Sequence, residues 1–232
     1  MPRRNSRKAH DAAGAVFHVY NRGAGGGLIF RDDADKRQFL HCFKRHLSEA
    51  EFRDSSGRRY RKLRDSVSLL SYNLMPNHYH LVVRQLAPRG LSKLMRSAIR
   101  GYVQYFNRRH GRTGAVFSGS YRAVAIEDSL QFRSVIAYVH TNHWDGPGYP
   151  WCSHNAYAEF AADPSDAPGW LDIGYVLKRF RRVRGLHPVP RPLHAPEAHP
   201  VNMGQTLHKR ALGARLCSKN RLGITPARPA TS

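Results

Sequence analysis

Two periods of hydrophobic positions alternate along the first part of this chain, and each indicates a different secondary structure. A period of two residues is typical of a strand, whereas spacings of three and four are typical of an amphipathic helix. The first period predicts strands over residues 16–20, 66–73, 78–83 and 121–126. The second predicts helices that begin at Asp32, run from Leu91 to Arg109, and run from Asp128 to about Asn142. Beyond residue 151 both patterns weaken.

The order of these elements predicts an α+β fold. A strand, a helix, two strands, a helix and a strand form split βαβ units, which build a ferredoxin-like antiparallel sheet with helices packed on it. The helix that follows the fourth strand is an addition to that plan. We expect a basic N-terminal arm over residues 1–14, one folded domain over 15–160, and a basic, partly disordered C-terminal extension over 161–232.

The third predicted strand carries two histidines on one face. Side chains alternate faces along a strand, so His78 and His80 point one way while Tyr79 and Leu81 point the other. Two imidazoles on one face can both reach a single cation, and the apolar residues attach the strand to a core. The pattern therefore indicates a divalent-metal site, with a pair of half-exposed surface histidines as the alternative.

The last predicted helix offers a tyrosine and an asparagine from beside its apolar stripe. At about 100° per residue, Tyr138 lies well away from the centre of the stripe, and Asn142 follows one turn later on the same side. If this side faces the sheet, His78, His80 and Asn142 would ligate a divalent cation and Tyr138 would stand beside it. The alternative is that Tyr138 is an ordinary residue at the edge of an amphipathic helix. The stripe itself consists of Phe132, Val135, Ile136 and Val139.

This combination of groups suits chemistry on a phosphodiester. The anionic oxygens of a phosphodiester repel nucleophiles, and a bound cation offsets the charge that develops in the transition state. A tyrosine can then attack phosphorus and form a covalent phosphotyrosine. Because that link retains the energy of the phosphodiester, a DNA hydroxyl can reverse the reaction without ATP.

The charge of the chain favours a polyanionic partner. It holds 38 Lys and Arg against 16 Asp and Glu, a formal net charge of +22. Neutralising phosphates with such cations releases counterions, which drives nucleic-acid binding. A solvated, solubilising surface is the alternative.

Cysteines and hydropathy exclude several other classes. Cys42, Cys152 and Cys217 are far apart and form no Cys-x-x-Cys pair, so they predict neither a zinc ribbon nor a disulfide framework. No stretch approaches the roughly 18 apolar residues that a membrane-spanning helix needs. We therefore expect a cytoplasmic protein with no membrane partner.

Seven short motifs, in order, resemble those of a known family. The chain is similar to the HUH single-stranded-DNA endonucleases, and more narrowly to the REP-associated tyrosine transposases of the IS200-like (Y1) group, over about residues 15–157. The motifs are Val19–Gly23, Ile29–Asp33, Met75–Leu81, Tyr105–Gly111, Gly119–Arg122, Tyr138–Asn142 and Tyr149–Ser153.

The resemblance implies a specific activity and site. It implies cleavage of single-stranded DNA at or near an imperfect palindromic hairpin, with Tyr138 as the nucleophile and a 5′-phosphotyrosine intermediate. It implies His78, His80 and Asn142 as ligands of Mg²⁺ or Mn²⁺, and Mn²⁺ suits imidazole ligands better. Related enzymes act as monomers or as homodimers. The link at residues 51–65 is longer than is usual in similar sequences.

Recognition of single-stranded or hairpin DNA needs phosphate contacts and stacking surfaces. We expect phosphate contacts from five arginines and base stacking from one tyrosine on the second predicted helix. Two other functions stay open: a catalytically silent nucleic-acid-binding protein, such as a repressor or an RNA-binding module, and an HUH replication initiator. The contact residues are Arg22, Arg100, Tyr105, Arg108, Arg109 and Arg122.

Overall fold

Four antiparallel strands form the sheet at the centre of the structure, a computed structural model that describes residues 12–142, 149–163 and 168–181. The strands lie in the order β2-β3-β1-β4, so each crossover connection passes over a neighbouring strand. This is the predicted ferredoxin-like arrangement of split βαβ units, and the predicted fold class is confirmed. The strands are β1 (Val16–Arg22), β2 (Val67–Met75), β3 (His78–Gln85) and β4 (Arg122–Ile126).

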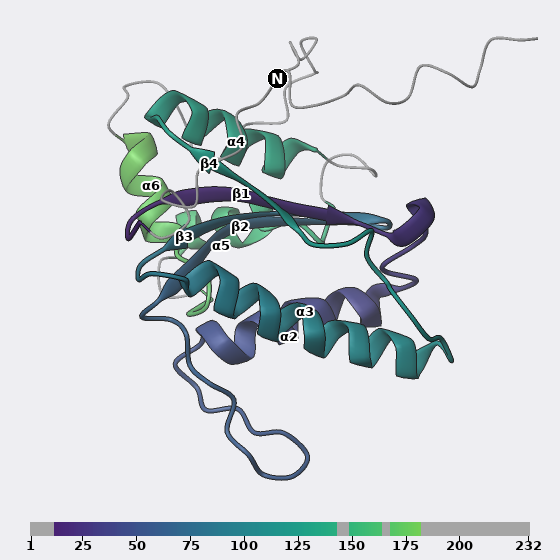
Figure 1. Cartoon of the computed structure of the whole chain (residues 1–232). Helices are drawn as coiled ribbons and strands as arrows, with labels where there is room; N and C mark the ends of the chain where they lie inside the picture. The colour runs from purple at the N-terminus through teal and green to yellow at the C-terminus, as the bar shows by residue number, and fades with distance from the viewer. Residues whose placement is uncertain (1–11, 143–148, 164–167, 182–232) are drawn as a thin grey trace, which may run out of the picture. The chain divides into compact units, whose positions relative to one another are not determined.

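Helices α2 (Asp33–Leu47) and α3 (Gly90–Arg109) cover one face of the sheet (Figure 1). The Asp32 carboxylate caps α2 by accepting from the Asp35 N–H, which satisfies a free donor of the first turn. A short 3₁₀ turn, η1 (Ala24–Gly26), precedes this helix. Both helices bury an apolar stripe against the sheet, as their three-four spacing predicts.

Helix α4 (Ser129–Thr141) lies on the opposite face of the sheet (Figure 1). Asp128 caps it by accepting from the Gln131 N–H, at the position that the sequence predicts. Two further helices, α5 (His154–Ala162) and α6 (Ile173–Arg181), follow it in the chain. The hydroxyl of Tyr157 in α5 donates to the Leu70 carbonyl of β2, which fixes α5 to the sheet.

The alternation along the strands gives the two sheet faces different residues. In the β1–β3 register, Tyr20 pairs with His80 and Asn21 pairs with Tyr79, so paired residues share a face. On the α2 and α3 side, Tyr79 is fully buried and its ring lies 5.0 Å from that of Phe39. On the α4 side the sheet presents polar groups, including both predicted metal ligands of β3.

Part of the predicted domain layout lies outside the described residues, namely residues 1–11 and 182–232. The predicted domain boundary at residue 160 stays a prediction. The described fold continues beyond that residue, since the apolar face of α6 is buried and α6 contacts β2. No helix within the described residues combines the length and the apolar character needed to cross a membrane.

Candidate active site

The two histidines of β3 present one ring nitrogen each to the α4 side of the sheet. His78 begins the strand, and its Nδ1 lies 2.8 Å from the Asn77 side-chain oxygen, so Nδ1 carries the proton and donates. His80 is nearly buried, and its ring centroid lies 5.1 Å from that of His78. The strand period places both on one face, with the buried Tyr79 between them anchoring the strand from the other side.

Helix α4 delivers the tyrosine and the asparagine together. Tyr138 is 44% exposed, the highest exposure of any aromatic side chain in the described residues. Asn142 caps the C-terminal end of α4, and its Nδ2 lies 3.2 Å from the Tyr138 hydroxyl and donates to it. The spacing of four residues that the sequence singled out therefore produces a direct contact.

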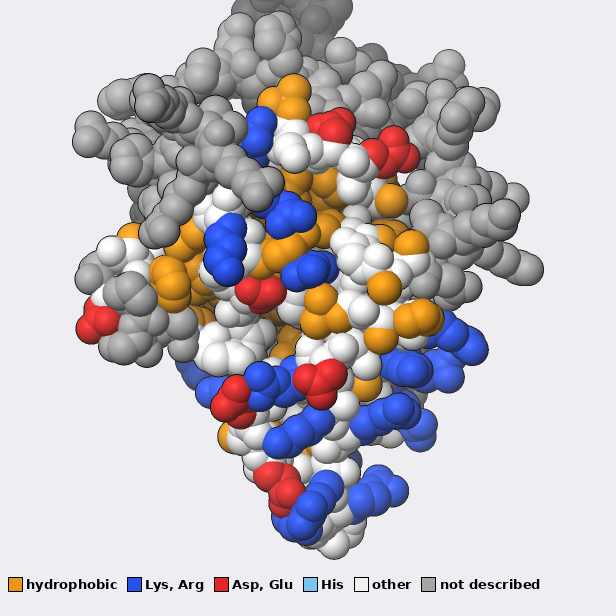
Figure 2. All heavy atoms as spheres, turned by 90° about the vertical axis from the view of Figure 1, so that its left-hand side faces the viewer, with side chains coloured by type: hydrophobic (Ala, Val, Ile, Leu, Met, Phe, Trp, Pro, Cys, Tyr) orange, Lys and Arg blue, Asp and Glu red, His pale blue; other side chains and the backbone are white. Residues whose placement is uncertain are grey.

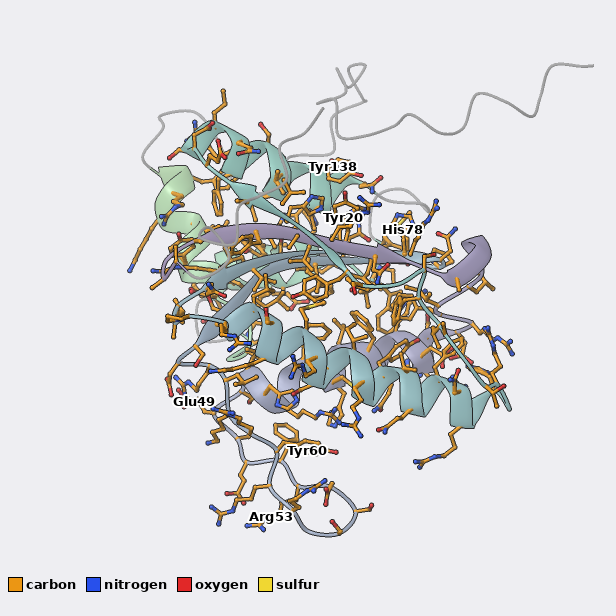
Figure 3. The ribbon with its side chains drawn as sticks, viewed as in Figure 1. Tyr20, Glu49, Arg53, Tyr60, His78 and Tyr138 are labelled. Carbon is orange, nitrogen blue, oxygen red and sulfur yellow. The ribbon has the colours of Figure 1, made fainter. Side chains whose placement is uncertain are left out.

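The tyrosine of α4 and the histidines of β3 meet within one subunit. The ring centroids of Tyr138 and His80 are 5.4 Å apart, with the planes at 83°. Figure 3 shows Tyr138, His78 and Tyr20 on the same side of the sheet. The four residues predicted to carry the chemistry are thus brought together, while their roles as nucleophile and ligands stay predictions.

A third histidine, which the sequence reasoning missed, supports His80 from behind. His18 of β1 is buried, and its Nε2 lies 2.9 Å from Nδ1 of His80. The two rings are stacked with centroids 5.1 Å apart. This contact occupies Nδ1 of His80 and leaves Nε2 for a ligand, and a hydrogen bond to the second ring nitrogen is what orients a metal-binding histidine. The available signal was the alternation of β1, which puts His18, Tyr20 and Arg22 on one face.

Asn73 of β2 is a second missed residue, and it holds the end of α4. Its side chain is fully buried, and its Nδ2 donates to the carbonyls of Val139 at 2.9 Å and of Asn142 at 2.7 Å. These carbonyls belong to the last turn of the helix, where no intrahelical donor remains. Because Asn73 pairs with His80 in the sheet register, one pair of neighbouring strand residues positions both halves of the site.

Burial sets the protonation of the site. Burial, with smaller contributions from the neighbouring His18 and His78, lowers the pKa of His80 to about 3. Burial also lowers the pKa of His18 to about 4 and lowers the pKa of His78. The imidazoles are therefore neutral at pH 7, which is the form that binds metals. Burial and then the neighbouring Tyr20 raise the pKa of Tyr138, so this side chain rests as the protonated phenol.

The donor set fits a divalent cation. Among the described residues, no three His, Cys, Asp or Glu side chains form a metal-holding cluster. The predicted metal site would therefore rest on two neutral imidazoles and the amide oxygen of Asn142. This N/O set suits Mn²⁺ more than Mg²⁺.

Two of the arginines predicted to contact DNA lie beside this site. Arg22 pairs with His78 across the β1–β3 ladder, and Arg122 pairs with Tyr20 across the β1–β4 ladder. Both side chains are exposed. They share the α4 face with the histidines, and their contact with DNA stays a prediction.

The other predicted DNA contacts are on the α2 and α3 side. Arg109 donates to Asp32 at 2.7 Å and to the fully buried Asp35 at 2.5 Å, and its guanidinium lies 6.0 Å from the Tyr105 ring. Arg109 and the half-buried Tyr105 thus take part in joining the two helices, and their contact with DNA stays a prediction. Arg100 and Arg108 are exposed on α3 and separated from Tyr138 by the sheet.

Comparison with known proteins gives a family match over the middle of the chain. Residues 51–142 match the model of a family described as "Transposase IS200 like". That segment contains His78, His80, Tyr138 and Asn142, and it begins after β1. Residues 51–142 are thus similar to the IS200-like transposases, the family that the sequence motifs resemble.

One solved structure similar to this chain is that of a REP-associated tyrosine transposase bound to a REP hairpin. The two sequences are 13% identical, the TM-score is 0.43, and the similarity covers 70% of this chain and 89% of that chain. No curated protein matches the chain.

Proposed function

We propose that this chain is a metal-dependent single-strand DNA endonuclease and strand transferase that cleaves and rejoins DNA at or near palindromic hairpins. The reaction runs through a covalent 5′-phosphotyrosine on Tyr138. The observation that carries the proposal is the 5.4 Å approach of the Tyr138 and His80 rings, with Asn142 donating to the tyrosine hydroxyl. The match to the IS200-like transposases supports the same reaction class.

The ligands of the proposed site are Nε2 of His78, Nε2 of His80 and the amide oxygen of Asn142. The neighbours of the two histidines occupy Nδ1 in each ring, which leaves Nε2 for the ion. When bound, Mg²⁺ or Mn²⁺ polarises the scissile phosphate and offsets the charge that develops on its oxygens.

The chain's own residues then direct the attack. The Tyr138 oxygen forms a bond to phosphorus, and the bond between phosphorus and the 3′ oxygen breaks. The phenol loses a proton and the departing 3′ oxygen gains one, so the products are a 5′-phosphotyrosine and a free 3′-hydroxyl. The Asn142 amide stabilises the developing phenolate because its N–H already points at that oxygen. Rejoining is the reverse displacement.

The proposed attack occurs in cis, within one chain. Asn73 fixes the last turn of α4, and the segment after the helix continues along β2, where the Leu74 N–H donates to the Trp151 carbonyl and the Ser153 N–H donates to the Tyr72 carbonyl. These backbone bonds support a helix that stays on its own sheet. A monomer can then carry out cleavage, and a homodimer with exchanged helices is not required.

The test is incubation of the full chain with labelled single-stranded hairpins taken from the DNA beside its gene. With Mn²⁺ we expect a protein–DNA adduct that survives denaturation, and with EDTA we expect none. Tyr138→Phe removes the nucleophile and should abolish the adduct while DNA binding persists. Tyr20→Phe is the matched control, because the Tyr20 ring also lies near His80, at 6.0 Å, and its adduct should persist.

Two outcomes would contradict the proposal. An adduct that persists in Tyr138→Phe and disappears in Tyr20→Phe would move the nucleophile to β1. Salt-sensitive DNA binding without an adduct under any divalent ion would instead identify a catalytically silent nucleic-acid-binding protein on the same fold.

A further inference from the structure

Arg84 of β3 and Arg179 of α6 cover the two faces of one tyrosine ring. The guanidinium carbon of Arg84 lies 4.1 Å from the centre of the Tyr175 ring, and that of Arg179 lies 3.8 Å from it. Two planar guanidinium groups would clash this close to a single ring face, so they lie on opposite faces. The three side chains therefore form a stack, which we call the arginine stack (Arg84, Tyr175 and Arg179).

The arginine stack lies on the same side of the sheet as the candidate active site. His80 and Arg84 are four residues apart in β3, so both point to the α4 side, about 13 Å apart along the strand. Phe132, near the start of α4, packs beside the stack, with its ring centroid 6.1 Å from that of Tyr175. Tyr138 follows six residues later, about 9 Å along the helix. The stack is thus at the end of α4 away from Tyr138.

The two arginines of the stack have no carboxylate partner. Among the described residues, neither guanidinium forms an ion pair, and Nε of Arg84 is buried without a hydrogen-bond partner. Nε of Arg133 in α4 is also buried without one. Asp172 caps α6, where its Oδ1 accepts from the Tyr175 N–H. Like charges held together, with buried donors left unpaired, are what an anionic ligand would satisfy.

The geometry of the arginine stack suits phosphate groups rather than bases. A stacked guanidinium keeps its in-plane N–H donors available for bidentate contacts with phosphate oxygens. Both faces of the Tyr175 ring are covered, so the ring cannot stack on a base, and phosphate contacts carry no sequence information. Figure 2 views the end of the molecule where α6 lies, and it shows Lys and Arg side chains among hydrophobic ones. A polyanion is therefore the matching partner.

We propose that Arg84, Tyr175 and Arg179 form a phosphate-binding site for single-stranded DNA, which holds the strand away from the point of cleavage. The phosphate chemistry follows from the stack itself, whereas a single strand as its source rests on the proposed function. Tyr175 is a positioning residue, because its ring supports both guanidinium groups and makes no contact of its own with the strand. Tyr175 and Arg179 lie beyond residues 51–142, so the family match does not supply this site.

The test measures binding of an unstructured single strand to the full chain by fluorescence anisotropy over a series of salt concentrations. Every protein carries Tyr138→Phe, so that no adduct forms. Each phosphate contact with a single strand contributes about 0.7 to the steepness of log K against log salt. Arg179→Gln should lower the steepness by about 0.7, and Arg84→Gln with Arg179→Gln by about 1.4. Arg61→Gln removes the same charge as Arg179→Gln from an exposed position in the link at residues 51–65, and it should leave the steepness unchanged.

Substitutions of the ring distinguish an organised site from a general effect of charge. Tyr175→Phe keeps the ring and should bind the strand as the parent protein does. Tyr175→Leu keeps every charge but removes the support that the two guanidinium groups share, so its steepness should fall toward that of Arg179→Gln. Circular dichroism of each variant verifies that the fold is retained.

Three results would overturn the inference. Equal steepness in Arg179→Gln and Arg61→Gln would exclude a phosphate contact at the stack. Equal binding by Tyr175→Leu and Tyr175→Phe would show that the ring organises no site. Pyrophosphate binding that is lost in Arg179→Gln, with strand binding unchanged, would assign the stack to small free phosphates instead of DNA. Failure of the cleavage proposal is distinguishable, because it would appear as a missing adduct in the unmodified chain, whereas these slopes are measured without cleavage.

Discussion

The two faces of the sheet are built by the same strands but hold different kinds of side chain. On the α2 and α3 side, Phe17, Tyr79 and Leu81 are fully buried in the apolar core. On the α4 side, the nearly or fully buried positions include His18, Asn73 and His80. Buried polar groups cost free energy unless they are paired, so they persist where they have a task. Packing on the α2 and α3 side therefore holds the strands in place. The same strands hold the polar side chains of the candidate site in position on the α4 side.

Buried polar atoms without a hydrogen-bond partner occur on both faces of the sheet, since the Tyr79 hydroxyl on the α2 and α3 side is one of them. Nδ1 of His18 and Oδ1 of Asn73 are buried and have no hydrogen-bond partner among the described residues. Each such atom costs about 1–3 kcal/mol. On the α4 side the two residues are tied to the site, because His18 contacts His80 and Asn73 holds the end of α4.

The largest expected difference between the faces comes from two neighbouring residues of β3. Leu81→Ala opens a cavity in the fully buried core and should lower the free energy of unfolding by about 2–5 kcal/mol. The folded fraction should still form the DNA adduct. His80→Ala should cost less stability and abolish the metal-dependent adduct. Urea unfolding followed by circular dichroism, with the adduct assay on the same samples, measures both.

The proposed difference between the two faces would be wrong if Leu81→Ala left stability unchanged or if His80→Ala left adduct formation unchanged. A Leu81→Ala protein with an unchanged free energy of unfolding would show that packing on the α2 and α3 face does not provide most of the stability. A His80→Ala protein that still formed an adduct with Mn²⁺ would remove the histidine from the reaction.

Local periodicity was sufficient to predict much of this site. The alternation of β3 predicted that His78 and His80 share a face, and the helical spacing of Tyr138 and Asn142 predicted that they act as neighbours. The cap at Asp128 follows from its own short segment. These features depend on residues at most four apart, where backbone geometry alone determines which side chains meet.

The remaining features depend on contacts between distant segments. His18 meets His80 only because β1 lies beside β3, and the sequence pattern of β1 does not reveal its neighbour. Similarly, the sequence predicted Arg109 as a phosphate contact but did not reveal that Asp32 and Asp35, far upstream, pair with it. The sequence likewise did not reveal the hydrogen bonds within the link at residues 51–65, such as that from the Arg58 N–H to Asp54 Oδ1.

A smaller effect should follow from removing the attachment of α4 to the sheet. Asn73→Ala removes two buried hydrogen bonds to the last turn of α4 and should lower the free energy of unfolding by about 1–3 kcal/mol. Hydrogen exchange of the amides in that turn should accelerate, and the adduct should form more slowly because Tyr138 is less well positioned. Asn107→Ala is the control, since Asn107 makes one exposed bond to the Gly114 carbonyl on the other side of the sheet.

Comparing Asn73→Ala with Asn107→Ala distinguishes an effect on the position of Tyr138 from an effect on the overall stability of the fold. If Asn73→Ala and Asn107→Ala slowed adduct formation equally, loss of stability alone would account for both. If only Asn73→Ala did so, the contact with α4 is the cause.

The smallest change in stability, with a selective loss of function, is expected at His18. His18→Phe keeps an aromatic ring beside His80 but removes the nitrogen 2.9 Å from its Nδ1. Loss of such a supporting hydrogen bond typically weakens metal binding about 10–100-fold, because the ligand ring is no longer held in one orientation. Mn²⁺ titration by calorimetry should show this loss. Urea unfolding should stay within about 1 kcal/mol of the unmodified chain, because His18→Phe leaves Nδ1 of His80 unpaired but also removes the unpaired Nδ1 of His18. His18→Gln offers a side-chain carbonyl that can accept from the Nδ1–H of His80, so it should recover part of the Mn²⁺ affinity. Equal Mn²⁺ affinity in the unmodified chain and in His18→Phe would show that His18 only packs beside His80 and does not support metal binding.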